Sequence, residues 1–164
     1  MDISKISAGS SEKVNVFVEC TKGSKEFYKY DEKSGLFILK GMLVEPFPGC
    51  YGFIPQTHHI DAEPLDVLVI TSEPLKQGIL LEARPIGLIR LRARIPDEIL
   101  IVVPIVDKKY ENVKNLEDLE EKELGEIEGF LEKFKNLEIE NVFNAEHAKR
   151  AVEKSIELYK KRFG

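Results

Sequence analysis

The sequence lacks several features that would each mark a particular class of protein. It has no apolar run of about 18 residues, which excludes a transmembrane helix. Its first ten residues lack a hydrophobic core, so we expect no signal peptide. The two cysteines, Cys20 and Cys50, stand alone without the spacing of metal ligands. We therefore expect two buried thiols in a cytoplasmic protein.

The chain also lacks an excess of positive charge. It contains 24 lysines and arginines against 29 aspartates and glutamates, which gives a net charge of −5. Because nucleic-acid binding needs a basic face, this balance argues against a nucleic-acid partner. A length of 164 residues and 43% hydrophobic residues predict a single globular domain over residues 1–164. Residues 1–12 are rich in serine, and we expect them to be mobile.

What the chain does contain is a dense acidic segment. Asp61, Glu63 and Asp66 fall within six residues, directly before an apolar run that is typical of a strand. Like charges this close raise one another's pKa unless a cation lies between them, and carboxylate oxygens are the ligands that Mg²⁺ prefers. Pro64 keeps the segment out of a helix. The simpler interpretation is a solvated acidic loop, but the third acid and the following strand favour a metal site.

The hydrophobic pattern predicts short strands followed by helices. Residues 44–66 are expected to form a long loop, a kind of segment that is more often functional than idle. Short strands in series indicate a small barrel or sandwich. Strands are expected at 14–20, 26–30, 36–39, 67–71, 79–85, 86–93 and 98–103. An apolar stripe of Leu124, Ile127, Leu131 and Phe134 predicts one helix, with Asn115 as its N-cap, and a second helix is expected from Asn144 to about Arg162.

Several segments resemble the signatures of the soluble family I inorganic pyrophosphatases. Residues 61–69 are similar to the family's D-G-D-P-x-D-V-x-V motif, and residues 45–55 to the stretch that ends in Y-G-x-I-P. Residues 82–88 and 143–149 resemble its R-P-[IV]-G strand pair and the start of its final helix. The resemblance covers residues 14–163 in order. It implies a mainly β fold with α-helices, a five-stranded OB-like barrel with two C-terminal helices packed on it.

The resemblance also implies a function. The family reaction is the hydrolysis of pyrophosphate to two phosphates with Mg²⁺, or with Mn²⁺ in its place. The protein would be a homo-oligomer without a membrane partner, and prokaryotic members tend to form hexamers. By the same matching, metal would be held by Asp61, Glu63, Asp66, Asp97 and Glu19. The catalytic residues would be Asp66, Glu63 and Tyr51, with Asp66 or Glu63 nearest the attacking water. The residues that contact phosphate oxygens would be Lys40, Tyr51 and Lys135.

The expected site departs from the family pattern at several positions. The family's second aspartate ahead of Asp97 has no counterpart. Six other residues change type: Phe27 and Ile99 stand in place of lysines, Lys29 of an acid, Lys40 of an arginine, and Phe47 and Phe134 of tyrosines. Losing one transition-state donor typically costs about 10²–10³ in rate, so we expect hydrolysis to be weak or lost. The alternatives are a non-catalytic homologue that binds metal or phosphate, and a subunit that associates with an active relative.

Two further groups of residues allow a functional interpretation. His58 and His59 could bind a transition metal, but loop histidines near acids are usually polar surface, so we leave them out of the site. Arg90, Arg92 and Arg94 alternate on an expected strand and would share a face. We expect them to face solvent and pair with acids; the alternative is that they bind a phosphate oligoanion without hydrolysing it.

Overall fold

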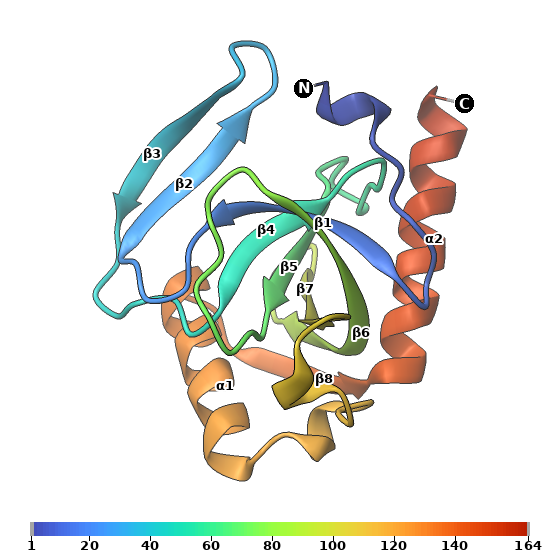
Figure 1. The fold of residues 1–164 in the computed structure, drawn as a ribbon. Coiled ribbons are helices and arrows are strands. Elements are labelled where there is room, and N and C mark those ends of the chain that lie inside the picture. Colours follow the sequence, from blue (N-terminus) through green and yellow to red (C-terminus); the bar gives the residue numbers. More distant parts are fainter. Residues whose placement is uncertain (1, 164) are drawn as a thin grey trace.

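Five strands close into a barrel, which positions every other element. In the computed structural model, which describes residues 2–163, the strand order around the barrel is β1-β4-β5-β7-β6, and β6 pairs back with β1 (Figure 1). Only β5 and β7 are parallel. The strands are β1 (Val14–Cys20), β4 (Cys50–Ile54), β5 (Leu65–Val69), β6 (Leu80–Leu91) and β7 (Asp97–Pro104). The five-stranded OB-like barrel that the sequence predicts is confirmed.

A separate hairpin covers one side of the barrel. Its strands, β2 (Glu26–Asp31) and β3 (Leu36–Met42), pair only with each other, and Figure 1 shows them standing away from the barrel wall. Gly35 makes the turn in a left-handed conformation, with a φ of 71°, which glycine adopts at little cost. The ring of Tyr30 packs edge-on against Phe17 of β1 at 4.9 Å. The hairpin therefore brings the residues next to Tyr30 over the outer face of β1.

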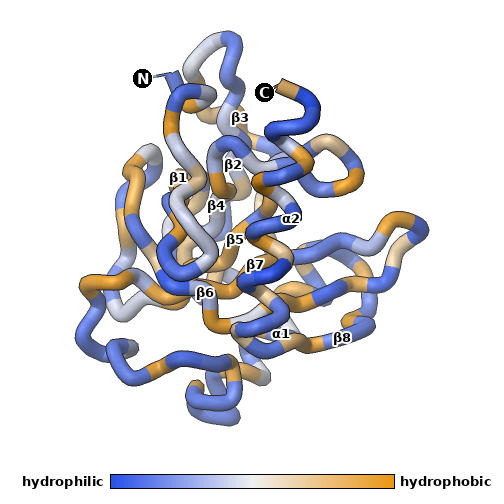
Figure 2. Tube along the Cα trace, turned by 90° about the vertical axis from the view of Figure 1, so that its right-hand side faces the viewer, coloured by the Kyte–Doolittle hydropathy of each residue, from blue (hydrophilic) through white to orange (hydrophobic). Residues whose placement is uncertain are grey.

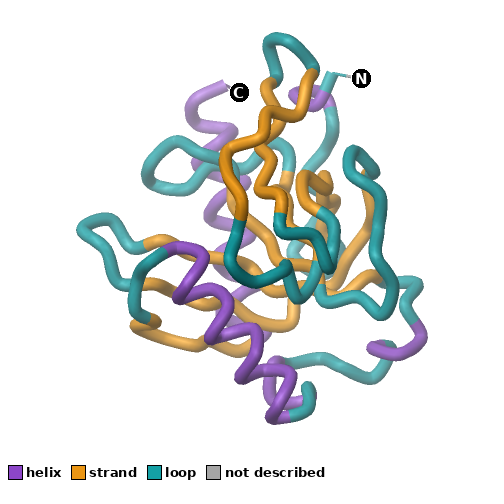
Figure 3. The backbone as a smooth tube through the Cα atoms, turned by 90° about the vertical axis from the view of Figure 1, so that its left-hand side faces the viewer, coloured by secondary structure: helices purple, strands orange, loops and turns teal. Residues whose placement is uncertain are grey.

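The C-terminal third supplies two helices and one more strand. α1 (Glu121–Lys135) lies on the same side as the hairpin (Figure 3), and β8 (Ile139–Asn144) adds to the edge of β6. α2 (Ala145–Phe163) packs along β6 and buries Ala148 and Val152. Figure 2 shows hydrophilic residues alternating with hydrophobic ones along α2, as expected for a helix with one buried face. Both predicted helices are thus present.

The remaining elements are three short 3₁₀ helices. They are η1 (Ile3–Lys5), η2 (Lys108–Tyr110) and η3 (Leu116–Asp118). Within residues 2–12, Ile3 and Ala8 are buried, and the Asn15 backbone N–H donates to the Ala8 carbonyl at 2.9 Å. Met1 lies outside the described residues. None of the helices in residues 2–163 combines the length and apolar character needed to cross a membrane. Cys20 and Cys50 are free and buried, as predicted.

Three element predictions were wrong, and one strand was not predicted. The expected loop 44–66 contains β4, which its flanking prolines and Gly49 conceal. The two strands expected at 79–85 and 86–93 are one strand that ends at Leu91, because its pairing with β7 shifts register after Pro85 and a bulge tolerates proline. Asn115 precedes η3 instead of α1. β8 was missed because its half-exposed pattern gives little periodicity.

Candidate active site

The predicted site residues converge on one cavity of about 740 Å³ at the side of the barrel beneath the hairpin. Tyr51 is buried beside it, and the other seven predicted residues line it: Glu19, Lys40, Asp61, Glu63, Asp66, Asp97 and Lys135. In all, the lining contains seven carboxylates and three lysines, the other members being Glu32, Glu98 and Lys29. The cavity therefore has a large excess of negative charge, which favours cations.

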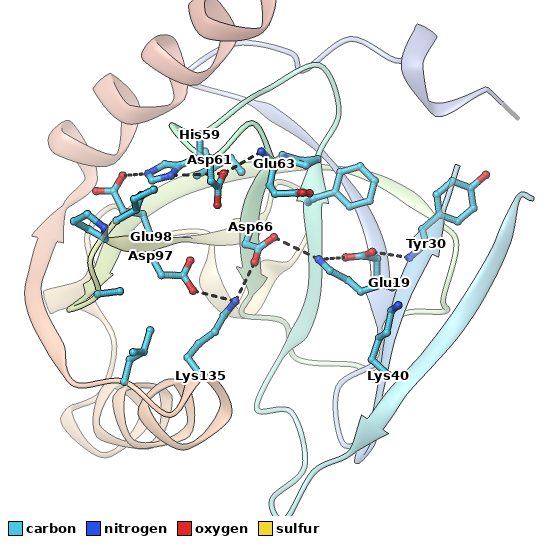
Figure 4. Close-up of a pocket in the computed structure, with 18 of the residues that line it drawn as sticks. Glu19, Tyr30, Lys40, His59, Asp61, Glu63, Asp66, Asp97, Glu98 and Lys135 are labelled. Carbon is cyan, nitrogen blue, oxygen red and sulfur yellow. Dashed lines mark hydrogen bonds and ion pairs between the residues drawn. The ribbon is translucent and has the colours of Figure 1, made fainter. Parts of the chain in front are cut away.

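Asp66 lies at the centre of the cavity (Figure 4), and three side chains hold it. The Tyr51 hydroxyl donates to its Oδ2 atom at 2.8 Å, and the Lys135 Nζ lies 3.3 Å from the same oxygen. The Lys29 Nζ lies 3.8 Å from Oδ1. Burial and the charge of Asp66 raise the pKa of Tyr51 well above its ordinary value. Tyr51 is therefore a neutral hydrogen-bond donor at any physiological pH.

Lys135 connects Asp66 to a second carboxylate. Its Nζ also lies 3.2 Å from Asp97 Oδ2, and its side chain is only 20% exposed. The residue is the last of α1, and the helix ends where Asn136 takes a left-handed conformation with a φ of 54°. α1 thus ends at the point that places one ammonium group between carboxylates from β5 and β7.

Glu19 is the most buried acid of the cavity, with a side chain that is 2% exposed. Its Oε2 accepts a hydrogen bond from the Tyr30 backbone N–H at 2.8 Å, whereas Oε1 is buried without a hydrogen-bond partner in residues 2–163. The nearest cation to Oε1 is Lys29 Nζ at 3.6 Å. Burial raises the pKa of Glu19 to about 7 in spite of that neighbour. A charge here is costly unless a cation compensates it.

A tight turn presents Asp61 and Glu63. The Ala62 N–H donates to the His59 carbonyl, the Glu63 N–H donates to Asp61 Oδ1 at 2.9 Å, and Ala62 has a φ of 67°. The family motif has a glycine at the position of Ala62, and an alanine in this left-handed conformation costs about 1 kcal/mol. The Thr57 hydroxyl anchors the turn by accepting from the Leu65 N–H at 3.0 Å.

His59, which the sequence analysis left out, connects this turn to the barrel. Its Nε2 lies 2.9 Å from Glu98 Oε1, and its Nδ1 lies 4.0 Å from Asp61 Oδ1. Arg90 holds the other oxygen of Glu98 at 2.9 Å and stacks on the Phe143 ring. No sequence signal identifies this chain of contacts, because it joins residues from three separate segments.

We expect the stability that His59 contributes to depend on pH. The hydrogen bond to Glu98 raises the pKa of His59 above 6.5 despite its partial burial. A histidine with a raised pKa stabilises the folded state fully below its unfolded pKa, and this contribution is lost as pH rises through the folded pKa. The free energy of unfolding should therefore differ between wild type and His59→Gln by about 1 kcal/mol in acid, near pH 5.5, and by less near pH 8.5. Urea denaturation measures both values, and an equal difference at the two pH values would contradict this expectation.

The aromatic replacements that the sequence analysis noted form one cluster. Phe134 packs against Phe27 at 5.0 Å, Phe47 at 5.4 Å and Tyr51 at 5.2 Å between ring centroids. Phe27 and Phe47 each contact Phe134, and these are the three positions at which the sequence resemblance leads us to expect a lysine and two tyrosines. Ile99 is fully buried in the barrel core and does not line the cavity.

The three arginines follow the simpler interpretation only in part, because Arg94 is exposed but makes no ion pair among residues 2–163 and the Arg90 side chain is only 28% exposed. Arg90 pairs with Glu98, and Arg92 lies 3.9–4.0 Å from Glu138 and Glu140 with a side chain that is 66% exposed. Arg92 and Arg94 lie beyond the end of β6, so the expected shared strand face does not form. None of the three lines the cavity.

The donor chemistry fits a divalent cation on one side of the cavity. Among residues 2–163, Asp61 and Glu63 make no ion pair with a lysine or arginine, and Asp97 Oδ1 is likewise without one. Hard cations such as Mg²⁺ prefer such oxygens, so these three residues, with Asp66, would hold it. On the other side, Lys29 lies between Glu19 and Asp66. No three His, Cys, Asp or Glu side chains of the described part are already gathered around one point.

Comparisons with known proteins agree on one family. Residues 16–160 match the family described as inorganic pyrophosphatase. A protein of Haloferax volcanii with that name is 34% identical over 161 residues, covering 93% of this chain and 91% of its own. The solved inorganic pyrophosphatase of Neisseria gonorrhoeae is 33% identical with a TM-score of 0.86, over 97% of this chain and 99% of its own. That of Thermus thermophilus is 29% identical with a TM-score of 0.89, over 98% and 99%.

Proposed function

The chain belongs to the inorganic pyrophosphatase family, and we propose that it hydrolyses pyrophosphate to two phosphates with Mg²⁺ in the cavity around Asp66. The observation that carries this proposal is the position of Asp66. A buried tyrosine hydroxyl and two lysine ammonium groups converge on one carboxylate at the centre of an acid-lined cavity. We assign the phosphate contacts to Lys40, Tyr51 and Lys135.

The charge of the cavity supports a requirement for metal. Pyrophosphate is a multiply charged anion, and seven carboxylates against three lysines would repel it. We propose that Asp61, Glu63, Asp66 and Asp97 hold Mg²⁺. When bound, the metal neutralises substrate charge and lowers the pKa of a bound water so that it can attack. Asp66, or Glu63, is the residue we assign to orient that water.

We further propose that hydrolysis is slower than in the named relatives. The family pattern would supply one lysine ammonium group and two tyrosine hydroxyls near the substrate. Phe27, Phe47 and Phe134 stand at those three positions. Each lost transition-state donor typically costs about 10²–10³ in rate. We also infer self-association into a homo-oligomer from the family, which the mass in solution measured by light scattering would test.

One observation favours a second candidate function, a non-catalytic homologue that binds metal or phosphate, alone or as a partner of an active relative. Both oxygens of Asp66 have partners, Lys29 on one side and Tyr51 with Lys135 on the other. A metal bound directly to Asp66 would lie close to the two ammonium groups, and their repulsion would weaken its binding. If Lys29, Tyr51 and Lys135 kept their contacts with Asp66, this carboxylate would not orient a metal-bound water. The cavity could then bind an anion–metal complex without hydrolysing it.

Phosphorus-31 NMR distinguishes the two candidates. Purified protein is incubated with pyrophosphate and Mg²⁺, and the spectrum is followed over time. Replacement of the pyrophosphate resonance by that of phosphate, abolished by a chelator, is the expected result. A pyrophosphate resonance that broadens and shifts with protein but keeps its intensity would mean binding without hydrolysis, and would overturn the first candidate in favour of the second.

A further inference from the structure

We propose that Lys29 is a built-in cation that occupies the position of one divalent cation between Glu19 and Asp66. The cavity then binds metal only on the side of Asp61, Glu63 and Asp97. This inference deepens the proposed function. It rests on one part of that function, namely that this cavity is the metal site. It concerns the number of ions that the cavity takes.

The geometry around Lys29 is that of a shared counter-ion. Its Nζ lies 3.6 Å from Glu19 Oε1 and 3.8 Å from Asp66 Oδ1, so it lies between two carboxylates from different strands. Both distances are longer than those of strong charge-assisted hydrogen bonds, so the attraction is mainly electrostatic. Within residues 2–163, Glu19 Oε1 is buried without a hydrogen-bond partner. A negative charge on such an oxygen is costly unless a cation compensates it, and Lys29 is the cation beside it.

The hairpin fixes Lys29 in this position. The next residue, Tyr30, donates its backbone N–H to Glu19 Oε2 at 2.8 Å, and its ring packs on Phe17. Lys29 itself pairs in register with Ile38 of β3. The strand pairing and the hydrogen bond of Tyr30 thus fix the backbone from which the Lys29 side chain reaches the two carboxylates. The side chain is 39% exposed, whereas that of Glu19 is 2% exposed.

The other two lysines of the cavity do not lie between Glu19 and Asp66. Lys135 neutralises Asp66 and Asp97 from the opposite side. Lys40 lines the cavity but makes no ion pair among residues 2–163, so it is not a counter-ion to any particular acid. Asp61, with a side chain that is 49% exposed, and Glu63 remain without a lysine or arginine partner in that range. Two of the uncompensated acids of the cavity thus lie at the turn, and a third, Glu32, directly follows β2 in the hairpin.

The test is a titration with Mn²⁺ alone, followed by the electron paramagnetic resonance of the free ion. Mn²⁺ suits the same oxygen ligands as Mg²⁺. Wild type is compared with Lys29→Glu, Lys29→Met and the matched control Lys40→Glu. The control changes the charge of the same cavity by the same amount, at a residue that does not lie between Glu19 and Asp66.

We expect Lys29→Glu to bind one more Mn²⁺ per chain than wild type. Lys29→Met should bind Mn²⁺ at least tenfold more tightly, by about 1.4 kcal/mol, and Lys40→Glu should gain no ion. If wild type already binds as many ions as Lys29→Glu, or if Lys40→Glu gains the same ion, the proposal is overturned. If Lys29→Glu does not fold, an unchanged Mn²⁺ affinity in Lys29→Met would still overturn it.

These titrations contain no pyrophosphate, so they do not depend on hydrolysis. A chain that fails to hydrolyse pyrophosphate can still gain an ion on substitution of Lys29. A chain that hydrolyses pyrophosphate efficiently can still fail to gain one. The two proposals therefore fail separately.

Discussion

Replacing Lys135 with methionine is expected to lower the rate of pyrophosphate hydrolysis by about 10²–10³. Lys135 Nζ lies 3.3 Å from Asp66 and 3.2 Å from Asp97, where it can donate to a phosphate oxygen as charge develops on it. Methionine is one atom shorter than lysine, but it keeps a flexible unbranched side chain and has no charge. Steady-state phosphate release at saturating Mg²⁺ measures the effect.

The same helix provides a matched control. Lys133 is 68% exposed and pairs with Glu45 at 2.6 Å, outside the cavity. Lys133→Met removes the same charge from the same helix end, so its rate should stay within a factor of about two, since surface ion pairs contribute little. Equal losses in the two variants would show that the effect comes from the helix end, and that Lys135 has no specific part in hydrolysis.

Replacing Gly52 with alanine is expected to reduce the free energy of unfolding by about 3 kcal/mol. A Cβ atom at Gly52 would lie 2.0 Å from the carbonyl oxygen of Phe17 and 3.1 Å from the Cα atom of Val18. Both are backbone atoms of β1, with which β4 pairs through Gly52 and Val18. Relief would require the barrel to open beside Tyr51. Guanidinium denaturation measures the change.

Gly125 in α1 is the control for this substitution. A Cβ atom there would meet nothing within 4 Å. Because glycine inside a helix costs about 0.5–1 kcal/mol relative to alanine, Gly125→Ala should raise the free energy of unfolding by that amount. Changes of opposite sign in the free energy of unfolding would distinguish the effect of close backbone packing at Gly52 from that of helix propensity at Gly125. Destabilisation of similar size at both positions would contradict the assignment of the Gly52 effect to contact with β1.

The alternating strands, such as the Val14, Val16 and Val18 series whose side chains are all buried, indicated only a small barrel or sandwich. The resemblance to the family then specified the five-stranded barrel. The local pattern was insufficient where it conflicts with tertiary pairing. Cys50–Ile54 is surrounded by turn residues, yet it forms a fully buried strand because β1 and β5 lie on both sides of it. Local propensity carries no information about such neighbours.

In the site, too, local sequence patterns identify some residues, whereas residues joined by tertiary contacts escape them. Asp61, Glu63 and Asp66 could be found from their spacing, since the acids lie close together in the chain. The contact of His59 with Glu98 could not, because the two residues are 39 positions apart. The sequence drew attention to Lys29 only because the family pattern that it resembles has an acid at this position. Its position between Glu19 and Asp66 depends on the hairpin packing over β1, which no short-range pattern reports.

The most direct test of the central claim is the rate of phosphate release from pyrophosphate with Mg²⁺, measured for wild type beside Asp66→Asn purified in the same way. The substitution keeps the shape of the side chain and removes the charge on which Tyr51, Lys29 and Lys135 converge. Hydrolysis by wild type that falls to the background rate in Asp66→Asn is the predicted result. Equal trace rates in the two preparations would point to a contaminating enzyme and would contradict the proposal that this cavity hydrolyses pyrophosphate.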